Sequence, residues 1–463
     1  MQTTQEKLSL KEKIGYSLGD TASNLYFQTF MLFLMYFYTD VFGLPAAAVG
    51  TMFLITRIWD TVNDPIMGTI ADRTNTRWGK FRPYLIWVSI PFGIMGVLTF
   101  TTPNFDVTGK LIYAYVTYNL LMMAYTAINV PYSALMGVIT PNSLERTELS
   151  SYRFVAAFVG GLIVQAATMS LVKYFGKGNE AVGWQWAMGC LSVLAVILFL
   201  ITFLTTKERV YPPKEQKSDF KQDIKDLIHN KPWLLIAGAT VFQLLYVVVR
   251  NSSIMYYFKY YVKDQQLNIL FWKGEVSFDV LASSFMLSGT IVTILGAILT
   301  KWLAKKFDKK NTYAGALILS SIFCSLFYIL KPQDVLITYL LNLFISFALG
   351  PVSVLQWAMY TDTADYSEWQ NGRRATGLIM AASLFSLKLG LTLGGAIVGW
   401  LLAYYGFVAN QEQTLETING IKLLMSIYPA IAGLIGGLLM IMYPLNNKMM
   451  EKIEVELAAR RTN

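Results

Sequence analysis

The chain has 463 residues, of which 54% are hydrophobic and only 14% are charged. Water-soluble domains carry about a quarter charged residues, so the composition argues against a soluble enzyme and places most of the chain in a membrane. Lys and Arg number 38 and Asp and Glu 29, a formal charge of +9. In a soluble protein this excess would suggest nucleic acid, but nothing else in the sequence supports such a partner, and we expect none.

Twelve apolar runs are long enough to cross a bilayer, which takes roughly 20 residues. They predict an all-α integral membrane protein with twelve transmembrane helices in two six-helix, pseudo-symmetric bundles. In chain order the predicted spans are residues 15–42, 46–71, 83–101, 110–138, 152–174, 184–206, 233–258, 278–302, 312–330, 334–360, 375–405 and 420–443.

Basic residues are concentrated in alternate loops. The set of loops that includes both termini holds 27 Lys and Arg residues and the opposite set holds 8. Cytoplasmic loops carry the excess of Lys and Arg in membrane proteins. We therefore expect a multi-pass protein of the plasma (cytoplasmic) membrane with both termini in the cytoplasm.

The longest polar segment divides the chain into two groups of six spans. It contains Phe220, Ile224, Leu227 and Ile228 at helical spacing, which predicts a short amphipathic helix on the inner membrane surface. His229, the only histidine, is interpreted as a solvated loop residue. The predicted domains are an N-terminal bundle (1–206), a cytoplasmic middle loop (207–232), a C-terminal bundle (233–443) and a cytoplasmic tail (444–463).

A faint internal repeat accompanies this division. The chain reads GTIADRTNTRWGKFRPY after the second span and LTKWLAKKFDKKNTY after the eighth. Repeated bundles commonly place a substrate site at the midplane between them, although topology alone also produces two basic loops. Cys190 and Cys324 lie in apolar runs, so both are interpreted as buried small hydrophobic residues rather than a disulfide or metal site.

Ionisable side chains inside a span are costly and are therefore candidates for function. The second span carries three, in FLITRIWDTVNDPIMG: Arg57, Asp60 and Asp64. At about 100° per residue they share one helix face. Two acids one turn apart repel each other at low dielectric unless a cation lies between them or Arg57 neutralises part of the charge, which predicts a site for Na⁺ or a proton. The alternative is a closed salt-bridge network that only joins helices.

Neutral oxygens and a proline accompany these acids. Thr61 and Asn63 would add oxygen ligands, and Pro65 would help to free nearby backbone carbonyls. In the eleventh span, Lys388 is a lone lysine that is costly unless paired. The two acids of the second span are its natural partners, and snorkelling to an interface is the alternative.

Polar and aromatic residues suited to a sugar also recur within spans. Carbohydrates need amide or carboxylate partners for their hydroxyl groups and an aromatic face for the C–H side of the ring. The same residues can instead hold helices together. The candidates are Asp20, Asn24 and Phe27 in span one, Tyr125, Thr126, Asn129 and Tyr132 in span four, and Ser353, Gln356 and Trp357 in span ten.

Several motifs resemble those of one known family. They are YSLGD, MYFYTDVFGL, RIWDTVNDP, DPIMGTIADRTNTRWGKFRPYL, NVPYSAL and DTADYSEWQNGRRATG, and they extend over nearly the whole chain. They resemble the glycoside–pentoside–hexuronide:cation symporters, the melibiose permease family of the major facilitator superfamily. The resemblance implies that family's fold, and cation-coupled sugar transport rather than enzymatic activity.

The resemblance also implies roles for individual residues. A cation would bind at Asp60 and Asp64, with Asn63 and Thr126 at positions linked to cation choice. Lys388 matches the family's lysine of the eleventh span, and Arg153 matches an arginine that contacts sugar. The residues that resemble the family's cytoplasmic gate are Arg146, Asp362, Asp365, Glu368, Arg373 and Arg374.

The sequence departs from the melibiose permeases at the sugar positions. Asn24 and Asn129 stand where those proteins have aspartates, and Ser133 and Ser353 stand where they have tryptophans. A pocket with amides in place of acids should reject galactosides. The chain is more similar to the xyloside permeases, so the expected substrate is a xylose-containing oligosaccharide such as xylobiose or isoprimeverose.

The predicted mechanism is symport by alternating access, with no cofactor and with Na⁺ or H⁺ as the coupling ion. The expected partners are a small sugar and membrane lipid, and the expected functional unit is a monomer. One alternative keeps the fold and carries a lysolipid with Na⁺. A second is an integral membrane enzyme, against which the sequence has no HExxH motif or His- or Cys-rich cluster. A third is a non-transporting sensor.

Overall fold

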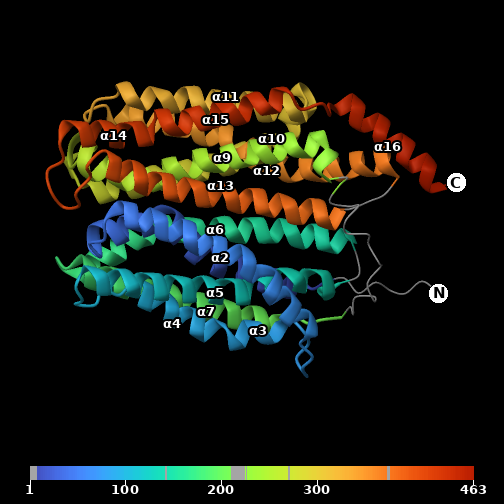
Figure 1. The fold of residues 1–463 in the computed structure, drawn as a ribbon, viewed down its shortest axis with the longest axis horizontal. Helices are drawn as coiled ribbons and strands as arrows, with labels where there is room; N and C mark the ends of the chain where they lie inside the picture. Colours follow the sequence, from blue (N-terminus) through green and yellow to red (C-terminus); the bar gives the residue numbers. More distant parts are fainter. Residues whose placement is uncertain are drawn as a thin grey trace. The chain divides into compact units, whose positions relative to one another are not determined.

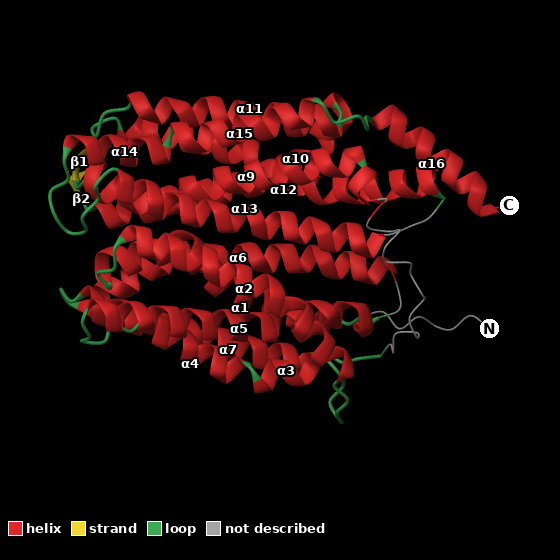
Figure 2. Cartoon of the chain, in the orientation of Figure 1, coloured by secondary structure: helices red, strands yellow, loops and turns green. Residues whose placement is uncertain are grey.

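The computed structural model describes residues 8–140, 143–209, 225, 227–269, 272–372 and 376–462, and nearly all of them are helical (Figures 1 and 2). In the first half the elements are α1 (Leu10–Thr29), the π-helical turns η1 (Phe30–Leu34) and η2 (Phe37–Val41), α2 (Ala46–Arg73), α3 (Arg82–Trp87), α4 (Ser89–Thr99), α5 (Val107–Ile139), α6 (Ser143–Gly176) and α7 (Glu180–Thr205).

The second half begins with α9 and contains one β-hairpin. Its elements are α9 (Lys231–Tyr256), the π-helical turn η3 (Tyr257–Val262), β1 (Gln265–Ile269), β2 (Trp272–Val276), α10 (Phe278–Phe307), α11 (Lys309–Ser325), the 3₁₀ turn η4 (Leu326–Ile329), α12 (Val335–Asn371), α13 (Thr376–Tyr404), α14 (Leu415–Met425), α15 (Ile427–Ile441) and α16 (Asn447–Thr462). The two strands pair antiparallel, with Gln265 opposite Val276.

The chain divides into two compact units, Met1–Lys214 with Val408–Asn410, and Glu215–Phe407 with Gln411–Asn463. Within the first unit, α1 packs against α6 and α7, α2 packs against α5, and α4 packs against α5 and α7. Within the second unit, α12 packs against α10 and α11, and α9 packs against α13 and α15. Each unit is therefore a helical bundle with its own interior.

Ten helices in the described part of the chain are long and apolar enough to cross a membrane. They coincide with ten of the twelve predicted spans. The other two are α1 and α2, whose sequences contain the polar run SLGDTASN and the charged residues Arg57, Asp60 and Asp64. Membrane helices keep such groups only where they face the protein interior or water. We therefore expect a functional site to lie along α1 and α2.

Several helices extend beyond the predicted cytoplasmic ends of the spans. The predicted tenth span ends at residue 360, but α12 continues to Asn371, where Gly372 closes it with a left-handed backbone (φ 70°). The segment DTADYSEWQN is therefore part of α12 and not a loop after it. Likewise α6 begins at Ser143 instead of 152, because polar residues outside the apolar core of a span still form helix.

Two span ends on the side predicted to face outward have a similar irregularity. Span one ends in the turns η1 and η2, and span seven ends in η3. The sequences there, MYFYTDVFGL from Met35 and MYYFKYYVKD from Met255, are alike. The repeat between the halves is thus also a repeat of local backbone geometry, and π-helical turns are often found at functional places.

The middle segment is described only in part. Phe220 and Ile224 lie outside the described residues, so the predicted amphipathic helix is not described as a whole. Leu227 is buried against Ala364 and Ile379 of the same unit, whereas Ile228 is exposed. His229 is exposed, and its Nδ1 lies 2.7 Å from the carbonyl oxygen of Lys225.

The two cysteines differ in their surroundings. Cys324 is buried, as predicted, but Cys190 is exposed on α7, so that part of the prediction is wrong. Both are free thiols. The reason is that residues facing lipid are as apolar as residues facing the interior, so an apolar run does not reveal which side of a helix is buried.

Close packing between α10 and α12 generates a prediction. A Cβ at Gly296 would overlap the backbone carbonyl of Phe347. We expect Gly296→Ala to destabilise the protein by about 1–3 kcal/mol, the usual result of overpacking. A lower melting temperature of the detergent-solubilised protein would show this. The control is Gly315→Ala on α11, where a Cβ meets nothing within 4 Å; an equal fall in both variants would contradict the packing argument.

Candidate functional site

The acids of span two meet a hydroxyl group from span four. Asp60 and Asp64 lie one turn apart on α2, and Asp60 is buried. Thr126 of α5 is also buried, and its Oγ1 lies 2.8 Å from Oδ1 of Asp60 and 3.1 Å from Oδ1 of Asp64. The packing of α2 against α5 therefore joins three residues that the sequence assigned to one cation site.

The two acids share one hydrogen-bond donor from Thr126. A threonine hydroxyl has one proton to donate, yet it lies within hydrogen-bond distance of two carboxylates. If both acids are ionised, one of the two contacts brings oxygens together without a shared proton, which is unfavourable at low dielectric. A proton on one carboxyl group, or a small cation between the oxygens, removes this conflict.

The third charged residue of span two is also close. Nη1 of Arg57 lies 3.8 Å from Oδ2 of Asp60, near the outer limit for an ion pair, with the guanidinium mostly shielded from solvent. Asn63 is half-buried on the same helix. The side chains of Thr61 and Pro65 are outside what the structure describes. No group of three or more His, Cys, Asp or Glu side chains that could hold a metal ion occurs among the described residues.

A second cluster joins spans one, four and five. Arg153 of α6 donates from Nε to Oδ2 of Asp20 (2.6 Å) and from Nη2 to Oδ1 (3.0 Å). The Tyr132 hydroxyl lies 2.6 Å from the same Oδ2. The guanidinium also lies over the rings of Tyr16 and Tyr132, at 5.6 and 5.1 Å. The carboxylate of Asp20 is thus compensated in a bidentate, charge-assisted pair.

The sequence explains this close approach. A Cβ at Gly19 would overlap the ring of Tyr132, so a glycine next to Asp20 lets the tyrosine lie directly against α1. The rings of Tyr16 and Tyr132 are stacked with their centroids 4.8 Å apart. The GD pair in YSLGD is therefore explained by packing and charge.

The amides of spans one and four have local partners. Nδ2 of Asn24 donates to the backbone oxygen of Asp20, and Nδ2 of Asn129 donates to that of Tyr125, both at 2.9 Å. Oδ1 of Asn129 accepts from Ser23 of α1 at 2.5 Å. Asn129 therefore connects α5 to α1, while Phe27, half-buried like both amides, lies on the same helix as Asn24.

The candidates in the second unit are described separately. Gln356 is buried on α12, and its Nε2 has no hydrogen-bond partner among the described residues. Trp357 is half-buried and meets Tyr360 edge to face at 6.3 Å. Lys388 is half-buried on α13, and Ser353 is exposed. A buried amide with an unused donor is unusual and suits a polar ligand.

Comparison with known proteins agrees with these observations. The family model described as MFS/sugar transport protein matches residues 15–447. The inner membrane symporter YicJ of Escherichia coli is 41% identical over 94% of this chain and 91% of its own length. The isoprimeverose transporter of Lactiplantibacillus pentosus is 36% identical over 89% of this chain and 84% of its own length.

This chain belongs to the glycoside–pentoside–hexuronide:cation symporter family of the major facilitator superfamily. It is a multi-pass membrane transporter and not an enzyme, as the sequence predicted. The crystal structure of a D-xylose–proton symporter has the same fold, with a TM-score of 0.62 at 13% identity over 95% of this chain and 98% of its own.

Charged residues at the predicted cytoplasmic ends of this symporter form ion pairs that sequence reasoning missed. Nζ of Lys309, at the start of α11, lies 2.7 and 2.9 Å from the two carboxylate oxygens of Asp362. Asp365 and Glu368 are half-buried on α12. The only signal in the sequence for this ion pair was that Lys309 belongs to the basic cluster after span eight. The side chain of Arg146, and Arg373 and Arg374, are outside the described residues.

The first unit has an equivalent set of pairs. Nζ of Lys13 lies 2.9 Å from Glu145 and 2.7 Å from Glu148, and Arg209 binds Glu12 with bonds of 2.6 and 2.9 Å. The hydrogen bond to Glu148 raises the pKa of the Lys13 ammonium group. These pairs join α1 to α6 and to the end of α7. No periodic apolar pattern points to them, because their partners are more than a hundred residues apart.

The hydroxyl between the two acids generates a prediction. Thr126→Val keeps the shape of the side chain and removes the hydroxyl. We expect cation affinity to fall about tenfold, as expected for loss of a hydrogen bond to a charged group, and Thr126→Ser to restore it. The measurement is the rise in melting temperature with NaCl at constant ionic strength, and separately with pH. Unchanged titration of the valine variant would exclude Thr126 from the cation site.

Proposed function

We propose that this chain imports a xylose-containing oligosaccharide, of the xylobiose or isoprimeverose type, together with Na⁺ or H⁺. The main observation in favour of a bound cation is that the single Thr126 hydroxyl lies within hydrogen-bond distance of two carboxylates. Membership of a cation-symporter family supports the coupling. The 36% identity to the isoprimeverose transporter supports the choice of sugar.

The proposed cation site brings two acidic side chains together. With Asp60 and Asp64 both ionised, a bound cation would add a favourable charge to that of Arg57, which lies 3.8 Å from Asp60. Oxygen ligands suit a hard cation, and a shared proton serves the same electrostatic purpose. Asn63 is the proposed neutral ligand on the same helix. The oxygen set is compatible with either ion.

The proposed sugar contacts in the first unit follow from the number of hydrogen-bond donors that Arg153 has left after binding Asp20. Arg153 has five N–H donors; two are used on Asp20, and Nη1 contacts the sulfur of Met136 at 3.6 Å. The two remaining donors are suited to sugar hydroxyl oxygens. The rings of Phe27 and Tyr125 are the proposed stacking surfaces, and Tyr132, whose buried ring stacks on Tyr16, is proposed to act through its hydroxyl group at Asp20. Amides at Asn24 and Asn129, in place of acids, disfavour a galactoside.

Residues of the second unit complete the proposal. Gln356, with an unused amide donor, and Trp357 are proposed to bind sugar, and Lys388 is proposed to respond to the cation charge. The gate residues Arg146, Asp362, Asp365, Glu368, Arg373 and Arg374 are proposed to close the cytoplasmic side. In this scheme the two predicted bundles, 1–206 and 233–443, move as bodies joined by the middle loop 207–232.

Coupling between the two ligands is reciprocal. If the cation tightens sugar binding, sugar must tighten cation binding by the same factor. The doubly loaded carrier then opens to the cytoplasm. We further propose that the protein functions as a monomer in the inner membrane, with both termini and the tail 444–463 in the cytoplasm.

Removing either acid tests the coupling. We expect Asp60→Asn and Asp64→Asn to abolish accumulation of sugar against a gradient, because the ion then has no charged ligand pair, while facilitated exchange of sugar persists. Radiolabelled uptake and exchange in membrane vesicles measure the two activities. The matched control is Glu275→Gln, whose side chain is exposed on β2. If both aspartate variants still concentrate sugar as the control does, the coupling assignment is wrong.

A substrate panel tests the sugar and the ion together. Vesicles with Na⁺ and pH gradients imposed separately are given isoprimeverose, xylobiose, melibiose and a lysophospholipid. We expect uptake of a xyloside, driven by one of the two gradients, and little uptake of the galactoside. Transport of melibiose would overturn the substrate proposal, and transport of the lysolipid alone would overturn sugar transport as a whole.

A further inference from the structure

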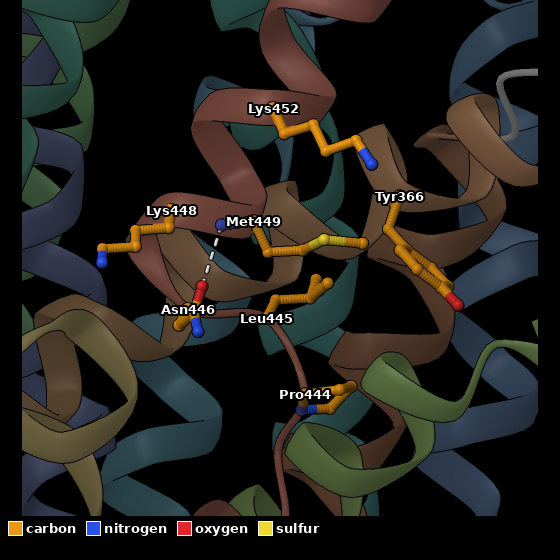
Figure 3. A pocket seen from close by; sticks show the side chains of 7 residues that line it. All are labelled: Tyr366, Pro444, Leu445, Asn446, Lys448, Met449 and Lys452. Carbon is orange, nitrogen blue, oxygen red and sulfur yellow. Dashed lines mark hydrogen bonds between the residues drawn. The ribbon is translucent and has the colours of Figure 1, made fainter.

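An open pocket lies where the last membrane span ends and α16 begins. It has a volume of about 450 Å³. Its lining includes Tyr366 of α12, Pro444 and Leu445 of the connecting segment, and Lys448, Met449 and Lys452 of α16 (Figure 3). In that view Lys452 extends past Met449 toward Tyr366, while Lys448 extends to the other side, away from Tyr366. The pocket therefore has an apolar floor formed by Leu445 and Met449, with Lys452 over one side and Lys448 at the rim.

The place of this pocket relative to the membrane follows from its neighbours. The segment Leu415–Ile441 is one of the helices apolar enough to cross a bilayer. Ile441 and Met442 are exposed (51% and 63%) although they are large and apolar, which suits contact with acyl chains. The pocket begins two residues later, on the side that the basic loops predict to be cytoplasmic. It thus lies at the depth of the lipid headgroups.

The walls of the pocket are fixed by packing. Met450, Ile453 and Leu457 of α16 are buried in a cluster with Tyr360 and other residues of the second unit. The indole N–H of Trp369 donates to Glu456 at 2.6 Å, which ties α12 to α16. A site that is already formed loses less affinity to ordering of side chains when a ligand binds.

The first turn of α16 is already capped by the protein. Oδ1 of Asn446 accepts from the backbone N–H of Met449 at 2.8 Å, and the backbone N–H of Asn447 donates to Asp308 at 3.0 Å. The helix N-terminus is therefore not the anion-binding element. The charge available to a ligand comes from the lysine side chains.

The charge and shape of the pocket select the class of ligand. Its lining has two ammonium groups and no carboxylate, and Lys452 forms a long ion pair of 3.8 Å with Glu456, which also accepts from Trp369. A free phosphate would leave the apolar floor in water, whereas a phospholipid covers that floor with its glycerol and acyl carbons and places its phosphate beside a lysine. Basic pockets at the cytoplasmic ends of membrane helices bind anionic headgroups in this way.

We propose that this pocket binds the headgroup of an anionic phospholipid. The lipid would bridge α16 and α12 at Tyr366, which lies between the predicted gate residues Asp365 and Glu368. A change in lipid composition would then change how firmly the α12 segment that carries these two acids is held against α16. The site is separate from the residues assigned to the cation and the sugar, so it stands without the transport proposal.

Lipid titration of the full chain tests the proposal. The detergent-purified protein is titrated with dioleoylphosphatidylglycerol or dioleoylphosphatidylcholine, and bound lipid is counted by native mass spectrometry. We expect the phosphatidylglycerol affinity to fall about fivefold for each lysine changed in Lys448→Gln and Lys452→Gln, since one lysine near an anionic surface contributes about 1 kcal/mol. Lys448→Arg with Lys452→Arg should retain binding.

The matched control removes the same charge at the same predicted side of the membrane. Lys301 and Lys305 are exposed, are also four residues apart and do not line the pocket, so their double glutamine variant should bind lipid as the unchanged protein does. An equal loss of phosphatidylglycerol affinity in both double variants would show that only general surface charge matters, and would overturn the proposed site. Competition by millimolar inorganic phosphate would also overturn the proposal, because it would identify a simple anion site. Equal binding of phosphatidylcholine and phosphatidylglycerol would overturn it as well.

Discussion

Two carboxylates share one hydroxyl group in the interior of a helical bundle, and the proposed coupling to an ion depends on that contact. Asp60 is buried, and Thr126 offers a single proton to it and to Asp64. Burial of charge is costly unless it is compensated, and Arg57 on the same helix lies 3.8 Å from Asp60. In the proposed mechanism the coupling ion adds further positive charge to this cluster, so that the empty and loaded forms of the carrier differ in free energy.

The neighbouring cluster is arranged differently. Asp20 has a full counter-charge in Arg153, with two charge-assisted hydrogen bonds and a tyrosine hydroxyl besides. It needs no ion to be stable. The two acidic sites in one bundle therefore have different surroundings: a bidentate arginine binds Asp20, whereas Asp60 and Asp64 share one threonine hydroxyl. This difference supports assigning the ion to Asp60 and Asp64 and neutral polar ligand contacts to the region around Arg153.

Charged residues at the helix ends have a different role, which is to join helices to one another. Lys309 with Asp362, and Lys13 with Glu145 and Glu148, join helices that are distant in sequence. In the second unit the long α12 carries both such a pair and the tie from Trp369 to α16. The lipid pocket proposed at Tyr366 would add a contact to the same segment. Ion pairs near the membrane surface are strengthened there by reduced exposure to water and weakened by salt.

The sequence alone determined the membrane class, the positions of the spans and the identity of the acids in span two, because long apolar runs and charges within them are local features. Motif resemblance added the family, which the comparisons established. It also gave Thr126 and Arg153 their expected roles, whereas Asp20 and Tyr132 were named because polar and aromatic residues recur within the spans.

Only the tertiary structure decided which of those residues are partners. That Thr126 faces both acids, or that Arg153 neutralises Asp20, depends on how α2, α5, α1 and α6 pack, and such distances between remote segments leave no periodic signal. The exposure of Cys190 was mispredicted for a related reason, since apolar residues face lipid as readily as the interior. The pocket beside α16 likewise depends on the folding of a polar tail back onto α12, which hydropathy does not encode.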